Sequence, residues 1–212
     1  MRGPECMTAT YRFARFVSYA YFKVFHRFRV CGLENIPASG AFLLASNHVS
    51  FFDPPALGCR LPRNLHYFAR STLFKGAFGK LIMALNSIPV NRDGADSSSF
   101  RRAFKTLNKG FPLLVFPEGT RSPDGRLQDP RRGVGLIACK AGVPVVPARV
   151  FGGHEAFGKG RKTPKLGVRF TVAYGTPFPI EAIDPGREQP DRYDLVAEAI
   201  MEAIRNLPAP LI

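Results

Sequence analysis

The sequence predicts an α/β fold: a mixed, mostly parallel sheet covered by helices, with an amphipathic interfacial helix at the N-terminus. First, short apolar runs typical of buried strands alternate with helix-length stretches along the chain. Second, 45% of the 212 residues are hydrophobic, which is enough for a sizeable core. Third, no internal repeat or low-complexity tract divides the chain. We therefore expect an N-terminal helix segment over residues 1–30 and one α/β domain over residues 31–212.

The segment from Tyr11 to Phe28 is rich in aromatic residues and predicts an amphipathic helix. At about 100° per residue, one broad face collects the apolar side chains of Phe13, Phe16, Val17, Ala20, Tyr21 and Val24. The basic side chains lie mostly on the other side: Arg12, Arg15, Lys23 and Arg29. Such a helix suits a membrane interface, with its rings below the headgroups and its cations among lipid phosphates. The alternative is a helix packed on the domain with a solvated basic face.

The remaining elements follow from apolar runs, helical spacing and turn residues. Strands are expected at residues 29–37 (a short strand and turn), 41–46, 64–70, 87–92, 111–117, 143–151 and 167–174. Helices are expected from Asp53 onward and over residues 73–86, 97–109, 133–142 and 193–207. Asp53 is a favoured N-cap, Pro54 suits a first helical turn, and Gly142 suits a helix end.

Charge and cysteine content limit the classes of partner. The formal net charge is +14, although the stretch from Glu181 onward is acidic. Such a field attracts nucleic acid, acidic lipid, phosphorylated substrates or an acidic carrier protein, and charge alone does not choose among them. The four cysteines are scattered, which argues against a zinc site or a disulfide framework and suits a reducing compartment. No segment approaches the roughly 18 apolar residues of a spanning helix, and we expect no secretory signal.

The stretch NHVSFFDP, residues 47–54, places a histidine and an aspartate after a predicted buried strand. Open α/β sheets bind their ligands at the carboxyl ends of strands. If the loop folds back, Asp53 accepts a hydrogen bond from one nitrogen of His48 and leaves the other nitrogen as a base. No nucleophilic serine or cysteine completes a triad, so the base would act on a hydroxyl of the substrate. The alternative is a half-buried histidine beside a helix cap.

Two further pieces place charged residues at strand ends. FPEGTRS follows the predicted strand that ends near Pro117, and it brings Glu118 and Arg121 within four residues. The guanidinium fork of arginine matches phosphate oxygens, and SIPVNR sets Arg92 at the end of another strand. The alternatives are a salt-bridged turn and a solvated loop arginine. A fourth piece, VPVVPARV, is mostly apolar, and it forms either a wall of the binding site or part of the hydrophobic core.

Together these pieces resemble the glycerophospholipid acyltransferase family, and the lysophosphatidate acyltransferase type in particular. NHVSFFDP matches the first block of the family, and Lys75-Gly76 through IPVNR matches the second. FPEGTRS matches the third block and VPVVPARV the fourth. The blocks occur in the order of the family over the stretch from Ile36 to Val150.

The resemblance implies a role for each matching residue. His48 is the general base and Asp53 holds it. Arg92 and Arg121 bind the substrate phosphate, and Lys75 adds positive charge. The residues that shape this pocket are Glu118, Gly119 and Thr120, and those that support the motifs are Asn47, Ser50, Pro54 and Pro117.

The resemblance also implies the reaction. A fatty acyl group passes from acyl-CoA or acyl-carrier protein, as co-substrate, to the free hydroxyl of 1-acyl-sn-glycerol 3-phosphate, giving phosphatidic acid. We expect no metal or other cofactor, and no nucleic acid as partner. The enzyme would lie peripherally on an anionic membrane surface, on the cytoplasmic face. The alternatives are another lysophospholipid or glycerol 3-phosphate as acceptor, and, in a different class, a non-catalytic basic membrane-binding protein.

Overall fold

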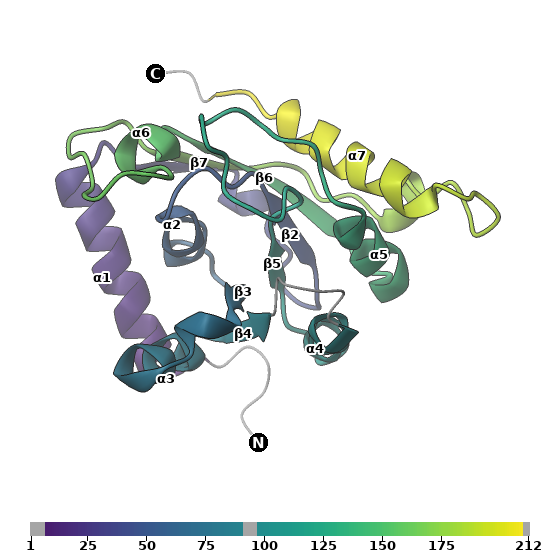
Figure 1. The fold of residues 1–212 in the computed structure, drawn as a ribbon, viewed down its shortest axis with the longest axis horizontal. Helices are drawn as coiled ribbons and strands as arrows, with labels where there is room; N and C mark the ends of the chain where they lie inside the picture. The colour runs from purple at the N-terminus through teal and green to yellow at the C-terminus, as the bar shows by residue number, and fades with distance from the viewer. Residues whose placement is uncertain (1–6, 91–96, 210–212) are drawn as a thin grey trace.

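A computed structural model describes residues 7–90 and 97–209 of the chain. At the centre of these residues is a seven-stranded sheet in the order β1-β7-β6-β2-β5-β3-β4 (Figure 1). The strands are β1 (Arg29–Cys31), β2 (Leu43–Ser46), β3 (His66–Arg70), β4 (Ser87–Val90), β5 (Leu113–Val115), β6 (Val145–Phe151) and β7 (Thr171–Tyr174). Neighbouring strands are parallel except for β6 and β7, which are antiparallel. The predicted mixed, mostly parallel sheet is confirmed.

Helices cover both faces of this sheet (Figure 1). They are α1 (Ala9–Phe25), α2 (Asp53–Cys59), α3 (Gly76–Ala84), α4 (Ser97–Asn108), α5 (Arg132–Ala141), α6 (Gly153–Phe157) and α7 (Arg192–Arg205). Short 3-10 helices occur at Leu33–Asn35, Ser71–Leu73 and Ile180–Ala182. One hydrophobic cluster joins α1 and α2 to the sheet, and a second joins α4, α5 and α7 to its other face.

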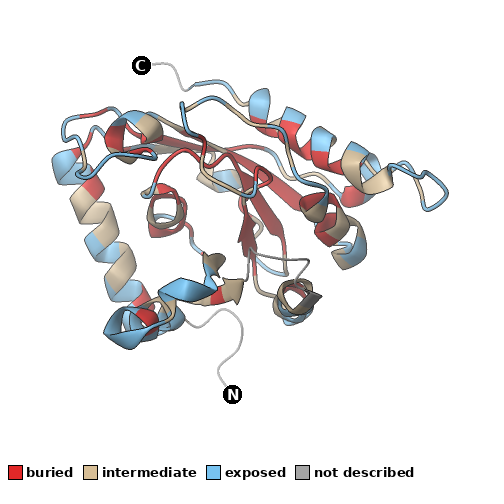
Figure 2. Cartoon of the chain, viewed as in Figure 1, coloured by how far each residue is buried: buried red, intermediate tan, exposed pale blue. Residues whose placement is uncertain are grey.

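Strand β2 shows why the apolar runs are continuous. Leu43 and Ala45 belong to the cluster under α5 and α7, whereas Leu44 belongs to the cluster under α1 and α2. Successive side chains of a strand point to opposite faces, so a strand covered on both sides must be apolar at every position. Figure 2 shows this buried centre in red. Because β2 lies between β5 and β6 and parallel to both, the loops that follow these three strands leave the sheet at the same edge.

Several elements differ from the prediction. The helix expected over residues 73–86 is shortened to α3, because Lys75 has an extended backbone (φ −112°, ψ 144°) that separates α3 from the 3-10 turn before it. The sequence did not predict α6. This helix has only five residues and lies between Gly152 and Gly158, so it is too short to show a helical pattern. The reversed direction of β7 was also not predicted, since an apolar run has the same pattern in either direction.

Helix α1 packs on the domain with the face opposite to its apolar stripe. Tyr11 and Phe22 are buried, and the Tyr11 hydroxyl lies 2.9 Å from that of Tyr67. Arg15, expected on an outward basic face, instead donates through Nε to the carbonyls of Gly58 and Cys59 at the end of α2, at 3.2 and 3.3 Å. The alternative of a packed helix with a solvated basic face is therefore wrong for Arg15, which lies against α2. None of the helices within the described ranges has the length and apolar character needed to cross a membrane.

The contact between α5 and α7 depends on a glycine. A Cβ added at Gly135 would lie 1.9 Å from the backbone carbonyl oxygen of Tyr193, so the helices must separate to accept it. We expect Gly135→Ala to lower the free energy of unfolding by about 3 kcal/mol, as measured by urea denaturation. The matched control is Gly133→Ala, where the nearest atom to a Cβ is 3.5 Å away. That variant should gain up to about 1 kcal/mol from helix propensity, and equal effects of both variants would contradict this account.

Candidate active site

The predicted pair of His48 and Asp53 is formed in the structure. Nδ1 of His48 lies 2.8 Å from Oδ2 of Asp53. The same oxygen accepts hydrogen bonds from the backbone N–H groups of Val49 and Ser50, each at 2.7 Å. An oxygen with two such donors is an acceptor toward the ring as well, so Nδ1 carries the imidazole proton. The lone pair is then on Nε2, which is the nitrogen that can take a proton from another molecule.

The carboxylate of Asp53 reaches His48 because the start of α2 offers it no donor. Helix α2 begins at Asp53 after Phe52 in the N-cap position, and no side chain caps it. Pro54 and Pro55 have no N–H, and the N–H of Ala56 already donates to the Phe52 carbonyl at 2.9 Å. The expectation that Asp53 is the N-cap is therefore wrong. Its side chain turns back to the preceding loop instead.

Burial sets the electrostatics of Asp53. Its exposed fraction is 0%, and burial raises its pKa because a charge is less stable away from water. The hydrogen bonds from His48, Ser50 and Val49 oppose this shift by stabilising the carboxylate. Its second oxygen, Oδ1, has no hydrogen-bond partner within the described residues and lies against Gly153, where a Cβ would be 3.1 Å away. A carboxylate confined in this way is placed to stabilise positive charge on the neighbouring imidazole.

The loop after β5 holds His48 from two further sides. The imidazole stacks on the ring of Phe116, with centroids 3.9 Å apart and an interplanar angle of 11°. The N–H of His48 donates to Oε1 of Glu118 at 2.8 Å, and its carbonyl accepts from the N–H of Ser122, also at 2.8 Å. The His48 side chain is 10% exposed. The ring is therefore nearly enclosed, and its position is set by both backbone and stacking.

Glu118 acts on this site from within the protein. Its Oε1 accepts from the N–H of His48, and its Oε2 accepts from Nε2 of Gln128 at 2.9 Å. Burial raises the pKa of Glu118, and these two hydrogen bonds oppose the shift. Both carboxylate oxygens are thus engaged by protein donors. Within the part of the chain that the structure describes, the contact that Glu118 makes with His48 positions the backbone of that residue.

Two supporting residues of the first motif join its loop to neighbouring elements. Asn47 forms a reciprocal pair with β6: its Nδ2 donates to the Val150 carbonyl at 3.1 Å, and its Oδ1 accepts from the Val150 N–H at 2.7 Å. The Ser50 hydroxyl donates to the carbonyl of Phe157 at 3.0 Å and accepts from the N–H of Phe52 at 3.1 Å. These contacts fix both ends of the loop that carries His48.

Arg121 lies beside the same loop. Its guanidinium carbon is 3.4 Å from the centre of the Phe51 ring, a cation–π distance. Pro117, before the turn, accepts a hydrogen bond from the N–H of Arg131 at 2.8 Å, and Gly119 adopts a left-handed φ of 69°. The turn therefore brings Arg121 to the segment that carries His48.

The other predicted ligands are less closely joined to His48. Thr120 lines a hollow of about 800 Å³ together with Glu118, Gln128 and Arg131. Lys75 is exposed and directly precedes α3, and no hydrogen bond or ion pair within residues 7–90 and 97–209 joins it to His48. Arg92 lies outside the described residues.

Four residues of this environment were not predicted: Phe116, Gln128, Arg131 and Gly153. Phe116 was counted as part of a buried strand, although its ring lies flat on the imidazole of His48. Gln128 lies in a loop without periodic pattern and reaches Glu118 across ten residues of sequence. For Gly153, a glycine is needed because a Cβ would press on Val49, Ser50 and Asp53 at 3.0–3.1 Å. Only the tertiary contact makes these roles visible.

The fold and the site place a carboxylate-oriented imidazole at the carboxyl edge of an α/β sheet, which is the geometry of a general base. The family described as Acyltransferase matches residues 27–150. This match covers more than half of the chain, and the chain belongs to that family. Within the described residues, no group of three or more His, Cys, Asp or Glu is placed to hold a metal ion.

Curated relatives are similar over a comparable length of the chain. A 1-acyl-sn-glycerol-3-phosphate acyltransferase of Bacillus subtilis is 35% identical over 139 residues, which are 63% of this chain and 68% of that protein. One from Pseudomonas aeruginosa is 33% identical and is matched over 53% of its length, and the chloroplastic BAT2 of Brassica napus is 34% identical and matched over 38%. The chain thus spans about half or less of these last two relatives.

A solved structure is similar over almost the whole chain. The crystal structure of the 1-acyl-sn-glycerophosphate acyltransferase PlsC from Thermotoga maritima superposes with a TM-score of 0.77 at 27% identity. The similarity covers 95% of this chain and 81% of that one. It therefore extends beyond residues 27–150, the region matched by the family.

Removal of the Asn47 amide should weaken the fold at this site. In Asn47→Ala the buried N–H and carbonyl of Val150 both lose their partner. We expect the free energy of unfolding to fall by about 2–4 kcal/mol, as measured by urea denaturation. Asn108→Ala, at an exposed position at the end of α4, is the control and should change it by less than about 0.5 kcal/mol. Similar values for both variants would show that the pair with β6 is not a stabilising contact.

Proposed function

We propose that this chain is a 1-acyl-sn-glycerol-3-phosphate acyltransferase. It transfers a fatty acyl group from an acyl thioester to the free hydroxyl of lysophosphatidate, and the product is phosphatidic acid. The observation that carries the proposal is the buried pair of Asp53 and His48, whose Nδ1 proton is directed to Oδ2 at 2.8 Å. The activity of the relatives, and the fold shared with PlsC, support the choice of this reaction.

The reaction needs one base and no enzyme nucleophile. Nε2 of His48 takes the proton of the acceptor hydroxyl as its oxygen attacks the thioester carbonyl, and the carbonyl electrons move to oxygen. When the tetrahedral intermediate collapses, the carbon–sulfur bond breaks and the thiolate leaves. The imidazolium then returns the proton to the sulfur, so His48 ends in its starting state. Asp53 stabilises the imidazolium between these steps, and a base so placed contributes about 10²–10⁴ in rate.

The phosphate of the acceptor binds to the basic groups around His48. Arg121 is held over Phe51 by the 3.4 Å contact, which aligns its planar fork and lowers the entropy lost on binding phosphate. Arg92 is proposed as a second phosphate ligand on the match of its motif, and Lys75 adds to the positive field. A phosphate monoester carries more charge than the diester of other lysophospholipids. Two arginines therefore favour lysophosphatidate over those acceptors.

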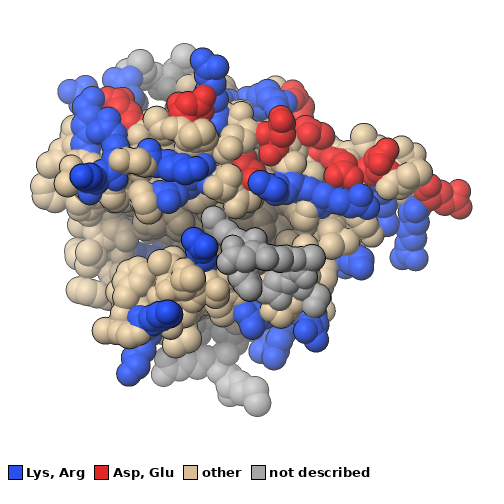
Figure 3. Space-filling view, viewed as in Figure 1, with Lys and Arg blue, Asp and Glu red and all other residues tan. Residues whose placement is uncertain are grey.

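The acyl donor is acyl-CoA or acyl-carrier protein, and both are anionic. Figure 3 shows basic side chains spread over the viewed face, whereas most acidic ones lie toward the upper right, where α7 lies in Figure 1, and others lie among basic side chains at the upper left. This field attracts either donor. The proposed chemistry is complete with the residues of the chain and the two substrates.

The His48–Asp53 pair is tested by two substitutions. We expect His48→Ala to lower acyl transfer by about 10²–10⁴, because no other base replaces Nε2. Asp53→Asn should lower it by up to about 10⁴, because a neutral amide does not stabilise the imidazolium. The measurement is phosphatidic acid formed by purified protein from lysophosphatidate and acyl-CoA or acyl-carrier protein, read by mass.

The control for these variants is vesicle binding and thermal unfolding, which His48→Ala should leave nearly unchanged. Transfer by His48→Ala at the wild-type rate would refute the mechanism. Wild-type protein that binds vesicles but transfers no acyl group to any acceptor would favour the non-catalytic membrane-binding alternative.

The chain is also proposed to work at an anionic membrane surface, on which α1 lies. Phe13, Phe16 and Val24 are 69%, 67% and 73% exposed along one stripe of α1. Each buried phenylalanine is worth roughly 1.5–3 kcal/mol, so their exposure favours a surface that covers them. Arg12 and Lys23 are exposed beside the stripe, at the position where lipid phosphates lie. This arrangement supports peripheral association, with acidic lipids as partners.

This surface is tested with a pair of single variants. Phe16→Ser should weaken sedimentation with anionic vesicles by about 10-fold, since one exposed ring no longer enters the lipid. Leu195→Ser is the control, because Leu195 is 45% exposed on α7, on the other side of the sheet. A deletion of α1 would be less informative, because Tyr11 and Phe22 belong to the packed fold. Equal binding of Phe16→Ser and wild type would place the lipid contact elsewhere.

A further inference from the structure

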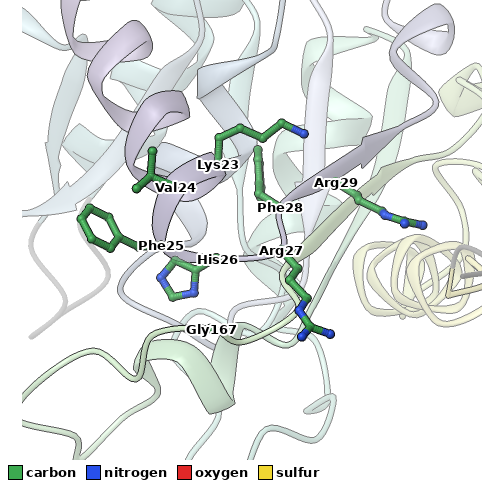
Figure 4. A pocket seen from close by; sticks show the side chains of 8 residues that line it. All are labelled: Lys23, Val24, Phe25, His26, Arg27, Phe28, Arg29 and Gly167. Atoms are coloured by element: carbon green, nitrogen blue, oxygen red, sulfur yellow. The ribbon is translucent and has the colours of Figure 1, made fainter.

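A basic hollow lies at the C-terminal end of α1. Its volume is about 410 Å³, and its walls come from the end of α1, the start of β1 and the backbone at Gly167. Figure 4 shows three long cationic side chains around it, those of Lys23, Arg27 and Arg29. No lining residue is acidic. It shares no residue with the motifs around His48, so the reaction proposed above does not account for it.

No acidic side chain within residues 7–90 and 97–209 neutralises the three cations. Among the described residues, no ion pair or side-chain hydrogen bond involves Lys23, Arg27 or Arg29, whereas nearby Lys165 is paired with Glu155 at 2.6 Å. The last carbonyls of α1 bring only a partial negative charge, about half a unit. One of them, that of Phe22, accepts from the N–H of His26 at 3.0 Å. The net field of the hollow is therefore strongly positive.

The backbone that carries these side chains is well fixed. The N–H of Arg27 donates to the Val168 carbonyl at 3.1 Å, and that of Arg29 to the Phe170 carbonyl at 3.0 Å. Residues two apart on an extended chain point to the same side, so both arginines face outward while Phe28 between them is buried. Gly167 donates to the Phe25 carbonyl at 2.8 Å and closes the other wall. An anion would thus meet prearranged cations.

His26 adds a second feature that indicates a polar ligand. It is only 4% exposed, and its ring nitrogens meet only the backbone at Val168 among the described residues, without the geometry of a full hydrogen bond. Its ring packs among Phe22, Phe52 and Phe170. Burial lowers the pKa of His26, which keeps the ring neutral with one N–H to donate. A buried donor without a partner costs about 1–3 kcal/mol, and an acceptor oxygen in the hollow would relieve that cost.

The hollow is continuous with the apolar stripe of α1. Val24 lines it and is 73% exposed, and Phe25 beside it is 44% exposed. From Val24 the stripe runs back along the helix through Val17, Phe16 and Phe13. A free phosphate would use only the cations. A phospholipid uses both parts, with its phosphate in the hollow and its chains beside the stripe.

We propose that this hollow binds the phosphate group of an anionic phospholipid in the membrane on which α1 lies. The proposal rests on the membrane association proposed above, and it names the lipid class that the surface recognises. Bound there, the lipid holds the C-terminal end of α1 at the level of the headgroups. The enzyme is then recruited to membranes rich in acidic lipid.

The test compares two triple variants with the same change in charge. Lys23→Gln, Arg27→Gln and Arg29→Gln together remove the cations of the hollow. The control, Lys105→Gln, Lys109→Gln and Lys140→Gln, removes exposed cations on and after α4 and on α5, on the other side of the sheet. Binding is measured by sedimentation with vesicles of phosphatidylcholine that contain one part in five phosphatidic acid, and with vesicles of phosphatidylcholine alone.

We expect the hollow variant to bind the anionic vesicles about 100-fold more weakly, and the control variant to lose less than about threefold. On phosphatidylcholine alone both should bind as wild type does. Equal losses in the two triple variants would overturn the proposal, because the attraction would then be that of the whole charged surface. Wild-type protein that binds inorganic phosphate in solution, but sediments no better with the anionic vesicles than with phosphatidylcholine alone, would also overturn it, in favour of a free-phosphate site.

Acyl transfer to lysophosphatidate in detergent micelles separates this proposal from the proposed function. The hollow variant should retain wild-type transfer there, because none of its three substitutions touches the site of His48. If the wild-type protein transfers no acyl group, the proposed acyltransferase function is refuted. The lipid site is then tested by the vesicle-binding measurements alone. A hollow variant that loses transfer in micelles while it keeps vesicle binding would show that the cations serve the reaction instead.

Discussion

The site depends on a single buried oxygen, Oδ2 of Asp53, that accepts three hydrogen bonds. Two come from the backbone of Val49 and Ser50 and one from His48. The first two close the loop after β2, and the third fixes the tautomer of the base. One carboxylate therefore determines both the shape of the loop and the chemistry of the ring. The two prolines that follow make this possible, because they leave the first turn of α2 without donors that would compete.

The packing of the sheet supplies the rest of the site. Because β2 lies between β5 and β6, the loops after these strands meet at its carboxyl end. From the β5 side, Phe116 stacks on the ring and Glu118 holds the backbone of His48. From the β6 side, Val150 is paired with Asn47. The imidazole of His48 is thus held by protein contacts before any substrate arrives, as the proposed proton transfer requires.

Helix α1 combines two roles on opposite faces. Tyr11 and Phe22 join it to the core, and Arg15 binds the end of α2. The opposite face remains apolar and exposed, and it ends at the basic hollow of Lys23, Arg27 and Arg29. A helix that was only a packing element would not expose phenylalanines, and one that was only an anchor would not bury Tyr11. The membrane surface and the catalytic domain are therefore parts of one rigid unit in this proposal.

The sequence by itself determined the fold class, the pairing of His48 with Asp53 and the family, because strand patterns and short motifs are local properties of the chain. It did not determine which face of α1 packs inward, since an apolar stripe has the same periodicity whether it meets a core or a lipid. It also did not determine the direction of β7 or the engagement of both oxygens of Glu118 by protein donors. Only the tertiary structure decided these features, because each depends on contacts between residues far apart in the chain, such as Glu118 with His48 across 70 positions.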